Sequence, residues 1–252
     1  MNWDALYEQY VASWAEAFAA RSALASFDPP ADAISCLAHP TDDDVRWILG
    51  ALRNPGEMPM GRQWFVNKLF KRSSDFSELF LEPLLDAAID EMDPSDNRHF
   101  VDPCMENFGP RRVNEYLLAV VKSGPDLRTA GAVNALYWAQ VPLVFTSTES
   151  FHIKDATPQS RALYQSLQDV WDRKDVVMLE TFVSNPDVWV RKSVISKLTL
   201  NPFRYPESHR PLVAQAITIA RTHPNEYIRH RVEHQLRDMG GGSIAHLRRS
   251  SR

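Results

Sequence analysis

Apolar side chains recur at helical spacing along almost the whole chain. In the first 18 residues, Trp3, Tyr7, Tyr10, Trp14 and Phe18 lie on one stripe, separated by polar positions. Residues three and four apart share a helix face, so this spacing predicts an amphipathic helix with the stripe buried. No segment shows the sustained alternation of a half-buried strand, and the pattern therefore predicts an all-α fold.

Further segments of the same kind follow, separated by short stretches that carry Pro, Gly, Asn or Asp. Pro in the first turn after Thr or Asn is a helix start signal, and Thr157 with Pro158 and Asn185 with Pro186 both fit it. Short turns between helices of about 10 to 16 residues make neighbouring helices pack antiparallel. The predicted helices span residues 43–52, 62–71, 77–91, 111–122, 127–140, 158–171, 175–183, 188–200, 211–222 and 226–239.

One stretch of sequence occurs twice. NPDVWVRKSVISKL at 185–198 aligns without a gap to HPNEYIRHRVEHQL at 223–236, 38 residues later. A period of this length fits one helix pair, which cannot bury its apolar face alone and is covered by the next pair. The matched positions are Pro186 and Pro224, Val190 and Ile228, Arg191 and Arg229, Val194 and Val232, and Leu198 and Leu236.

The string D-x-x-V-R-x-x-V-x-x-x-L, which begins at Asp187, resembles the second helix of a HEAT-like repeat, and a shorter version occurs at 125–136. The copy that begins at Pro224 departs from it, with Asn225 in place of the Asp. The resemblance implies a right-handed α-α superhelix, a HEAT-like solenoid of antiparallel helix pairs. We expect one solenoid over residues 1–239, with 1–40 as an N-terminal cap, 141–157 as an insertion loop and 240–252 as a flexible basic tail.

Charge is distributed unevenly along the chain. The net charge is −4, but residues 1–108 hold 19 Asp and Glu against 8 Lys and Arg, a net of −11, and residues 109–252 hold 13 against 20, a net of +7. Such asymmetry can steer a charged partner or reflect only solvated helix faces. With no basic and apolar leader and no apolar run of about 20 residues, we expect a cytoplasmic protein with no membrane segment.

Arg recurs near the start of the predicted second helices, at Arg128, Arg191 and Arg229. Equivalent positions of successive repeats line up, so these side chains would form a ladder. In one interpretation each Arg pairs with an Asp of its own or the next turn, such as Asp126 or Asp187. In the other, the ladder and its basic neighbours form an anion-binding concave face.

Trp189 lies one residue before the predicted buried Val190, at the mouth of a turn, where an exposed Trp beside Arg could anchor a protein or a nucleobase. Packing between adjacent turns is the alternative. The predicted partner-binding residues are Arg128, Trp189, Arg191, Lys192, Arg229 and Arg231.

His230, Glu233 and His234 match the H-x-x-E-H pattern of inverted zinc peptidases. The motif is short, its His side chains lie opposite the predicted core stripe, and only Asp238 follows as a further acidic ligand. Cys36 and Cys104 form no C-x-x-C pair. The sequence thus favours no catalytic residues, no metal and no cofactor.

The sequence favours a non-enzymatic protein–protein interaction scaffold or adaptor that uses the concave face of a short solenoid. Solenoids of this kind resemble adaptors and toxin-neutralising immunity proteins, and the acidic half would suit a basic target. The alternative is a nucleic-acid-binding protein that resembles HEAT-like alkylpurine DNA glycosylases and binds through the basic half. The sequence does not specify the oligomeric state.

Overall fold

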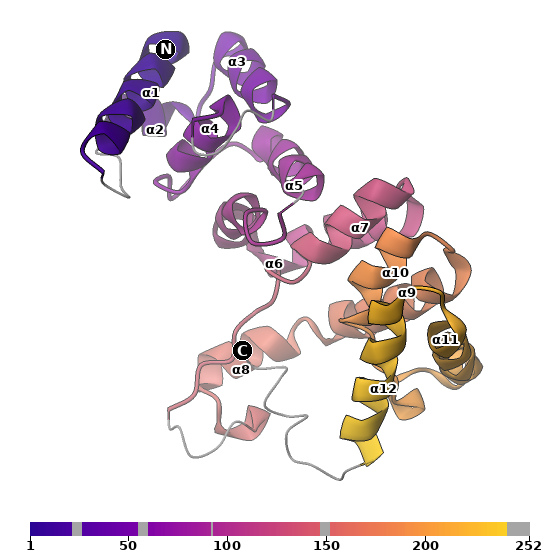
Figure 1. The fold of residues 1–252 in the computed structure, drawn as a ribbon. Coiled ribbons are helices and arrows are strands. Elements are labelled where there is room, and N and C mark those ends of the chain that lie inside the picture. Colours follow the sequence, from indigo (N-terminus) through magenta and orange to yellow (C-terminus); the bar gives the residue numbers. More distant parts are fainter. Residues whose placement is uncertain (22–26, 55–59, 92, 147–151, 241–252) are drawn as a thin grey trace. The chain divides into compact units, whose positions relative to one another are not determined.

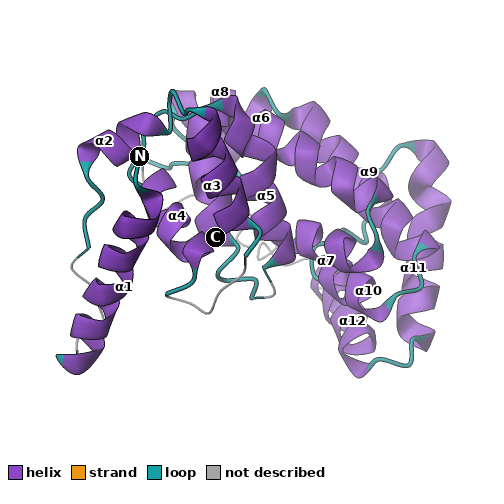
Figure 2. Cartoon of the chain, turned by 90° about the horizontal axis from the view of Figure 1, so that it is seen from above, coloured by secondary structure: helices purple, strands orange, loops and turns teal. Residues whose placement is uncertain are grey.

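The computed structural model describes residues 1–21, 27–54, 60–91, 93–146 and 152–240, with side chains described as far as Arg237. These residues form helices joined by loops and turns, as Figure 1 and Figure 2 show. Within them, the only β-type pairing is an isolated antiparallel bridge between Phe145 and Ala156. The all-α prediction is confirmed for this part of the chain. No described helix is long and apolar enough to cross a membrane.

The chain divides into two compact units, Met1–Gly109 and Pro110–Arg252. The boundary falls inside α6 (Arg98–Ser123), where Gly109 has φ 80° and ψ 159° and interrupts the helix. A side chain at positive φ is strained, so glycine suits this break. The uncharged Gly109 leaves the charge counts unchanged, so unit 1 has a net charge of −11 and unit 2 has a net charge of +7.

Unit 1 is built around α4, whose side chains are buried on nearly every side. A helix that is buried all round lies in the middle of its neighbours, and α4 contacts α1, α2 and α3. Besides residues 98–108 of α6, unit 1 contains α1 (Trp3–Ala19), α2 (Ala31–Cys36), α3 (Asp42–Leu52), α4 (Arg62–Phe70), η1 (Glu78–Phe80) and α5 (Leu81–Asp90).

Aromatic side chains fill much of the unit 1 core. Phe65 of α4 has its ring centroid 5.5–5.9 Å from those of Tyr7, Tyr10, Phe27 and Trp47, in edge-to-face and tilted arrangements. Pairs in these geometries stabilise by about 0.5–1.5 kcal/mol beyond the area they bury. Phe18, which the sequence places on the buried stripe of α1, is 54% exposed, so that part of the prediction is wrong.

A buried carboxylate joins α1 to α3. Asp44 is 2% exposed and accepts hydrogen bonds from Trp3 Nε1 at 2.7 Å, Thr41 Oγ1 at 2.6 Å and Thr41 N at 3.0 Å. The Thr41 hydroxyl accepts in turn from the Asp44 N–H, which completes a capping box at the start of α3. Burial acts to raise the pKa of Asp44, but hydrogen bonds from Thr41, Cys36 and Trp3 hold it well below its usual range.

Residues 98–108 form a helix that the sequence analysis did not predict. Pro103 lies inside it and cannot donate a hydrogen bond to the carbonyl of His99. The side-chain amide of Asn67 on α4 donates to that carbonyl instead. A contact from another helix thus compensates for the proline.

The helices of unit 2 pack in two sets. Helix α10 packs against both α7 and α12, and these three are the second helices of the predicted pairs. Helix α9 packs against α11, and these two are first helices (Figure 1). Besides residues 110–123 of α6, unit 2 contains α7 (Asp126–Ala135), η2 (Ile153–Asp155), α8 (Pro158–Gln165), α9 (Gln168–Ser184), α10 (Val188–Ile195), η3 (Pro202–Arg204), η4 (Glu207–His209), α11 (Arg210–Thr222) and α12 (Glu226–Gly240).

The two copies of the repeated sequence form similar turns. In the first copy, the N–H of Asp187 donates to Asn185 Oδ1 at 2.8 Å, and Asp187 Oδ1 accepts from Val190 N at 3.0 Å. In the second copy, the N–H of Asn225 donates to His223 Nδ1 at 3.0 Å, and Asn225 Oδ1 accepts from Ile228 N at 3.4 Å. Asp and Asn both serve as N-cap residues, so the turn is preserved although the second copy has Asn225 where the first has Asp187.

Several helix boundaries differ from the prediction. The predicted break between 171 and 175 is wrong: the break occurs at Ser166 and Leu167, and α9 continues through Trp171 to Ser184. Helix α10 begins after the cap Asp187, so Pro186 precedes the helix and does not lie in its first turn. By contrast, Thr157 caps α8 as predicted, with Pro158 in the first turn.

The predicted insertion loop at 141–157 is described at both ends. The N–H of Thr157 donates to the carbonyl of Val144 at 2.7 Å, which together with the Phe145–Ala156 bridge holds the two ends close to each other. Residues 147–151 and 241–252 lie outside the described part of the chain. The flexible tail stays a prediction, and so does the single solenoid over residues 1–239.

Candidate functional site

Three large apolar side chains are exposed at the same position of the three neighbouring second helices. Leu127, Trp189 and Tyr227 are each the second residue of their helix, α7, α10 and α12. Their exposures are 63%, 61% and 46%. We call Leu127, Trp189 and Tyr227 the exposed row. Contiguous exposed apolar residues on neighbouring elements are typical of interaction surfaces.

The local sequence explains why Trp189 and Tyr227 point outward. Val190 follows Trp189 and Ile228 follows Tyr227, and both β-branched residues are fully buried. On a helix, adjacent residues lie about 100° apart, so burying one turns its predecessor toward solvent. Of the two interpretations of Trp189, an exposed side chain and packing between adjacent turns, the structure shows the exposed side chain. Tyr227 could have been found in the same way, because it aligns with Trp189 in the repeat.

Lys192 lies against the Trp189 ring, with Nζ 4.5 Å from the ring centroid. A cation at this distance interacts favourably with the electron-rich face of an indole. The contact restrains the Trp189 ring, and 61% of the Trp189 surface stays accessible. A preorganised aromatic side chain is a good anchor, since little conformational freedom is lost on binding.

Two members of the Arg ladder bond to main-chain carbonyls at the ends of preceding helices. Arg191 Nε donates to the Phe182 carbonyl in the last turn of α9 at 3.3 Å, and Arg229 Nη1 donates to the His223 carbonyl just after α11 at 2.6 Å. The last carbonyls of a helix have no partner within it and carry partial negative charge. These guanidinium groups therefore close the turn inside each helix pair.

The predicted Asp partners are engaged elsewhere. Asp126 accepts from Asn185 Nδ2 at 2.7 Å, which ties the start of α7 to the turn before α10. Asp187 accepts from the first N–H groups of α10. Arg191 thus bonds to a main-chain carbonyl, and not to the Asp that one interpretation of the ladder assigned to it.

The remaining predicted residues differ in their surroundings. Arg128, in the first turn of α7, is half-buried. Arg231 is also half-buried, and its Nη2 donates to the Ser196 carbonyl at the end of α10 at 3.4 Å. The structure thus brings Arg128, Trp189 and Arg229 to the starts of adjacent helices, while Arg231 lies by the other end of α10.

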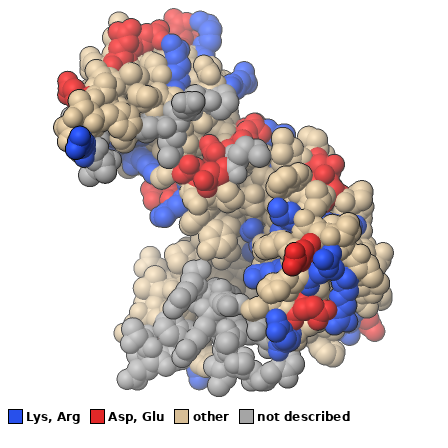
Figure 3. Space-filling view, in the orientation of Figure 1, with Lys and Arg blue, Asp and Glu red and all other residues tan. Residues whose placement is uncertain are grey.

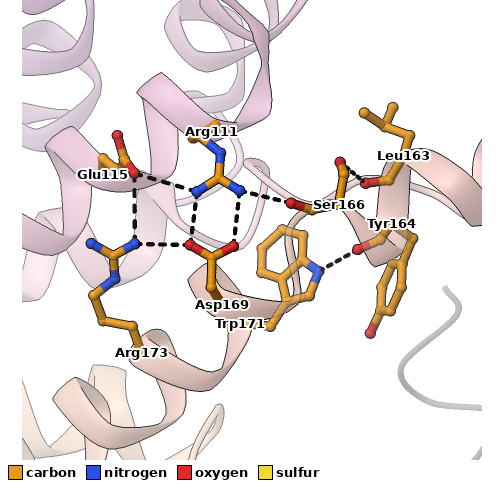
Figure 4. A network of polar contacts seen from close by, with 8 residues as sticks. All are labelled: Arg111, Glu115, Leu163, Tyr164, Ser166, Asp169, Trp171 and Arg173. Atoms are coloured by element: carbon orange, nitrogen blue, oxygen red, sulfur yellow. Dashed lines mark hydrogen bonds and ion pairs between the residues drawn. The ribbon is translucent and has the colours of Figure 1, made fainter.

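Arg111, a basic neighbour of the predicted ladder, belongs to an ion-pair network that joins α6 to α9 (Figure 4). Its Nη1 and Nη2 bond to the two oxygens of Asp169, both at 2.8 Å, and Nη2 also donates to the Ser166 carbonyl at 2.7 Å. Arg173 lies 3.4 Å from Asp169 and 3.6 Å from Glu115. The hydrogen bonds from Arg111 lower the pKa of Asp169 to about 2.

The H-x-x-E-H stretch lies on α12, and its carboxylate is paired. Glu233 Oε1 accepts from Arg221 Nε at 2.6 Å, and this hydrogen bond lowers the pKa of Glu233. The ring centroids of His230 and His234 are 6.5 Å apart. Among the residues whose side chains are described, no group of three or more His, Cys, Asp or Glu is placed to hold a metal ion; Asp238 falls outside them.

Basic side chains gather on one part of unit 2. On the face drawn in Figure 3, Lys and Arg cluster over α12 and the helices beside it. Several of these cations bond to carboxylates or carbonyls of the same unit. The net charge of +7 therefore overstates how many guanidinium groups are available to an external anion.

No protein-family model matches the chain, and neither a curated protein nor a solved structure does.

Proposed function

We propose that this chain is a non-enzymatic protein-binding scaffold or adaptor of HEAT-like architecture, with the exposed row of Leu127, Trp189 and Tyr227 as its principal contact surface. The observation that carries the proposal is the recurrence of an exposed large apolar residue at the second position of α7, α10 and α12. A single exposed apolar residue is ordinary, but here one recurs at the same position of α10 and of the two helices that contact it, α7 and α12, as expected of an interaction surface.

The chemistry of the row favours a protein partner. Trp and Tyr are enriched among residues that dominate binding energy at protein interfaces. Charges of both signs flank the row: Asp126 and Arg128 adjoin Leu127 in the sequence, Glu226 adjoins Tyr227, and Lys192 lies against Trp189. A mixed polar rim around apolar anchors is typical of protein–protein interfaces, whereas phosphate-backbone binding needs a predominantly positive surface.

Nucleic-acid binding is the second candidate, and the observation in its favour is the exposed Trp189 ring with the Lys192 cation beside it, since bases stack on aromatic side chains. It is weaker because Arg191 and Arg229 already bond to carbonyls, and Arg111 to a carboxylate.

The test compares two variants that remove exposed apolar surface. The row variant carries Leu127→Ser, Trp189→Ser and Tyr227→Ser; the control carries Phe203→Ser, which removes a ring that is 80% exposed elsewhere in unit 2. Affinity purification from cells that express each form should recover one partner with the wild type and the control but not with the row variant. Equal recovery with the row variant, or salt-sensitive recovery of nucleic acid alone, would overturn the proposal.

A further inference from the structure

Near the C-terminal end of α10, three cationic residues from three parts of the chain lie close enough for their charges to interact. Lys197 lies one residue beyond Ser196, the C-cap of α10, and its N–H donates to the Val194 carbonyl at 2.9 Å. Arg231 of α12 donates to the carbonyl of Ser196, the residue before Lys197. Lys174 of α9 lies close enough for its charge to act on Lys197. All three side chains are half-buried. We call Lys174, Lys197 and Arg231 the cation cluster.

The cation cluster is poorly compensated. Burial lowers the pKa of Lys197 to about 8, and the charges of Arg231 and Lys174 act in the same direction. Asp175 is the carboxylate that attracts Lys174, but it also lies 3.5 Å from Arg204. The end of α10 contributes only about half a negative charge, which is small against three whole positive charges.

One donor of the cluster lacks an acceptor. Arg231 Nη2 donates a hydrogen bond to the Ser196 carbonyl. Arg231 Nε is shielded from solvent and has no hydrogen-bond partner among the described residues. Gln235, one turn later on α12, donates to the Ile195 carbonyl at 2.9 Å and so helps to fix α12 against the end of α10; its own Oε1 has no described partner. A buried unpaired donor is costly unless something occupies the position.

We propose that Lys174, Lys197 and Arg231 form a binding site for an oxyanion of the phosphate class, either free phosphate or the phosphate group of a larger molecule. The site lies by the C-terminal end of α10, whereas Trp189 lies at the N-terminal end. The proposal does not depend on the proposed protein-binding surface. A dianion offsets more of the cluster's charge than a carboxylate does. Lys binds phosphate as a point charge, and the Arg fork offers a directional donor.

Thermal denaturation in phosphate and in sodium chloride at equal ionic strength tests the proposal. Because a ligand that binds only the folded state raises Tm, 20 mM phosphate at pH 7 should raise Tm by about 3 °C or more over chloride for millimolar affinity. Phosphoserine in place of phosphate distinguishes the sources: an equal or larger rise indicates that phosphate esters are accepted, and no rise indicates free phosphate.

Two variants and a control complete the test. Lys197→Met and Arg231→Met should each lose the phosphate-specific rise, and Lys197→Met should also denature at a higher Tm than wild type in chloride, because it removes a half-buried charge. Lys122→Met removes an exposed cation from α6 and should keep the full rise. A wild-type Tm no higher in phosphate than in chloride, or a rise that persists in both cluster variants, would overturn the proposal.

Discussion

The two units bury charge in opposite ways. In unit 1, the Asp44 carboxylate is buried with several donors directed at it, so the fold favours its ionised form. In unit 2, the Lys197 ammonium is half-buried beside two further cations, so the fold disfavours its ionised form. A buried charge stabilises a fold only when its surroundings replace the water it has lost. Unit 1 meets this condition at Asp44, whereas unit 2 does not meet it at Lys197.

Removing the Asp44 carboxylate should give the largest loss of stability. Asp44→Ala leaves the donors of Trp3 and Thr41 without an acceptor, so we expect the free energy of unfolding to fall by about 3 kcal/mol or more. Urea denaturation followed by far-UV circular dichroism measures the change. Asp43→Ala is the control, because the exposed Asp43–Arg46 pair should contribute less than about 1 kcal/mol. Equal losses would contradict the role assigned to Asp44.

The same carboxylate predicts an acid-sensitive stability. The folded-state pKa of Asp44 lies below the unfolded value, so its stabilisation is present above about pH 4 and is lost as the pH falls through the lowered folded value. Wild-type protein should therefore lose more stability between pH 5 and pH 3 than Asp44→Asn does, as measured by denaturation at each pH. Parallel curves for the two proteins would rule out this contribution.

Removing the Lys197 charge should have the opposite sign. Because one pKa unit corresponds to about 1.4 kcal/mol and solvent still reaches this side chain, Lys197→Met should raise the free energy of unfolding at pH 7 by about 1–2 kcal/mol. The folded-state pKa of about 8 lies below the ordinary value of 10.5, so wild-type stability rises as the pH passes from 8 to 10.5. The advantage of the variant should shrink over that range, and a constant difference would show that the buried ammonium charge is not its cause.

Removing the carbonyl contact of Arg191 should have a smaller effect. Arg191→Met keeps much of the apolar contact with Phe182 but loses the hydrogen bond to its carbonyl, so we expect a loss of about 1 kcal/mol. Arg173→Met is the control, since Arg173 is exposed and makes only surface ion pairs. Chemical denaturation of the two variants in parallel compares them. A loss for Arg191→Met no larger than for the control would mean that the contact is not structural.

The row variant should have the smallest effect on stability. Leu127, Trp189 and Tyr227 are mostly exposed, so the triple Ser variant should change the free energy of unfolding by less than about 1 kcal/mol in total. Differential scanning calorimetry can measure this together with the reversibility of unfolding. A larger loss would mean that the row contributes to folding and would weaken its assignment as a binding surface.

The two units also differ in how well the sequence predicts them. In unit 2, the repeated turn motif and the buried stripe of Val190 and Val194 locate α10 and α12, whereas for Trp189 the sequence leaves exposure and packing between turns as alternatives. In unit 1, α2 is only six residues long and carries no periodicity to detect. The helix at 98–108 contains Pro103, and the Asn67 amide that compensates for it lies far away in the sequence.

The candidate sites were predictable only in part, for a physical reason. Arg191 and Arg229 bond to main-chain carbonyls, and every residue has a carbonyl, so the sequence carries no sign of which one is the acceptor. Lys174, Lys197 and Arg231 are separated by 23 and 34 residues, and folding alone brings them together. A residue pattern can predict the face on which a side chain lies more readily than the group it contacts.

Site-specific photo-crosslinking tests the central claim most directly. A photoreactive amino acid placed at position 189 of the full chain, in cells that express it, should give one discrete protein adduct, and the same adduct should form from position 227. The same group at position 203, where the native side chain is even more exposed, should not give it. Absence of a protein adduct at 189 and 227, or the same adduct at 203, would contradict the claim that the exposed row is a protein-binding surface.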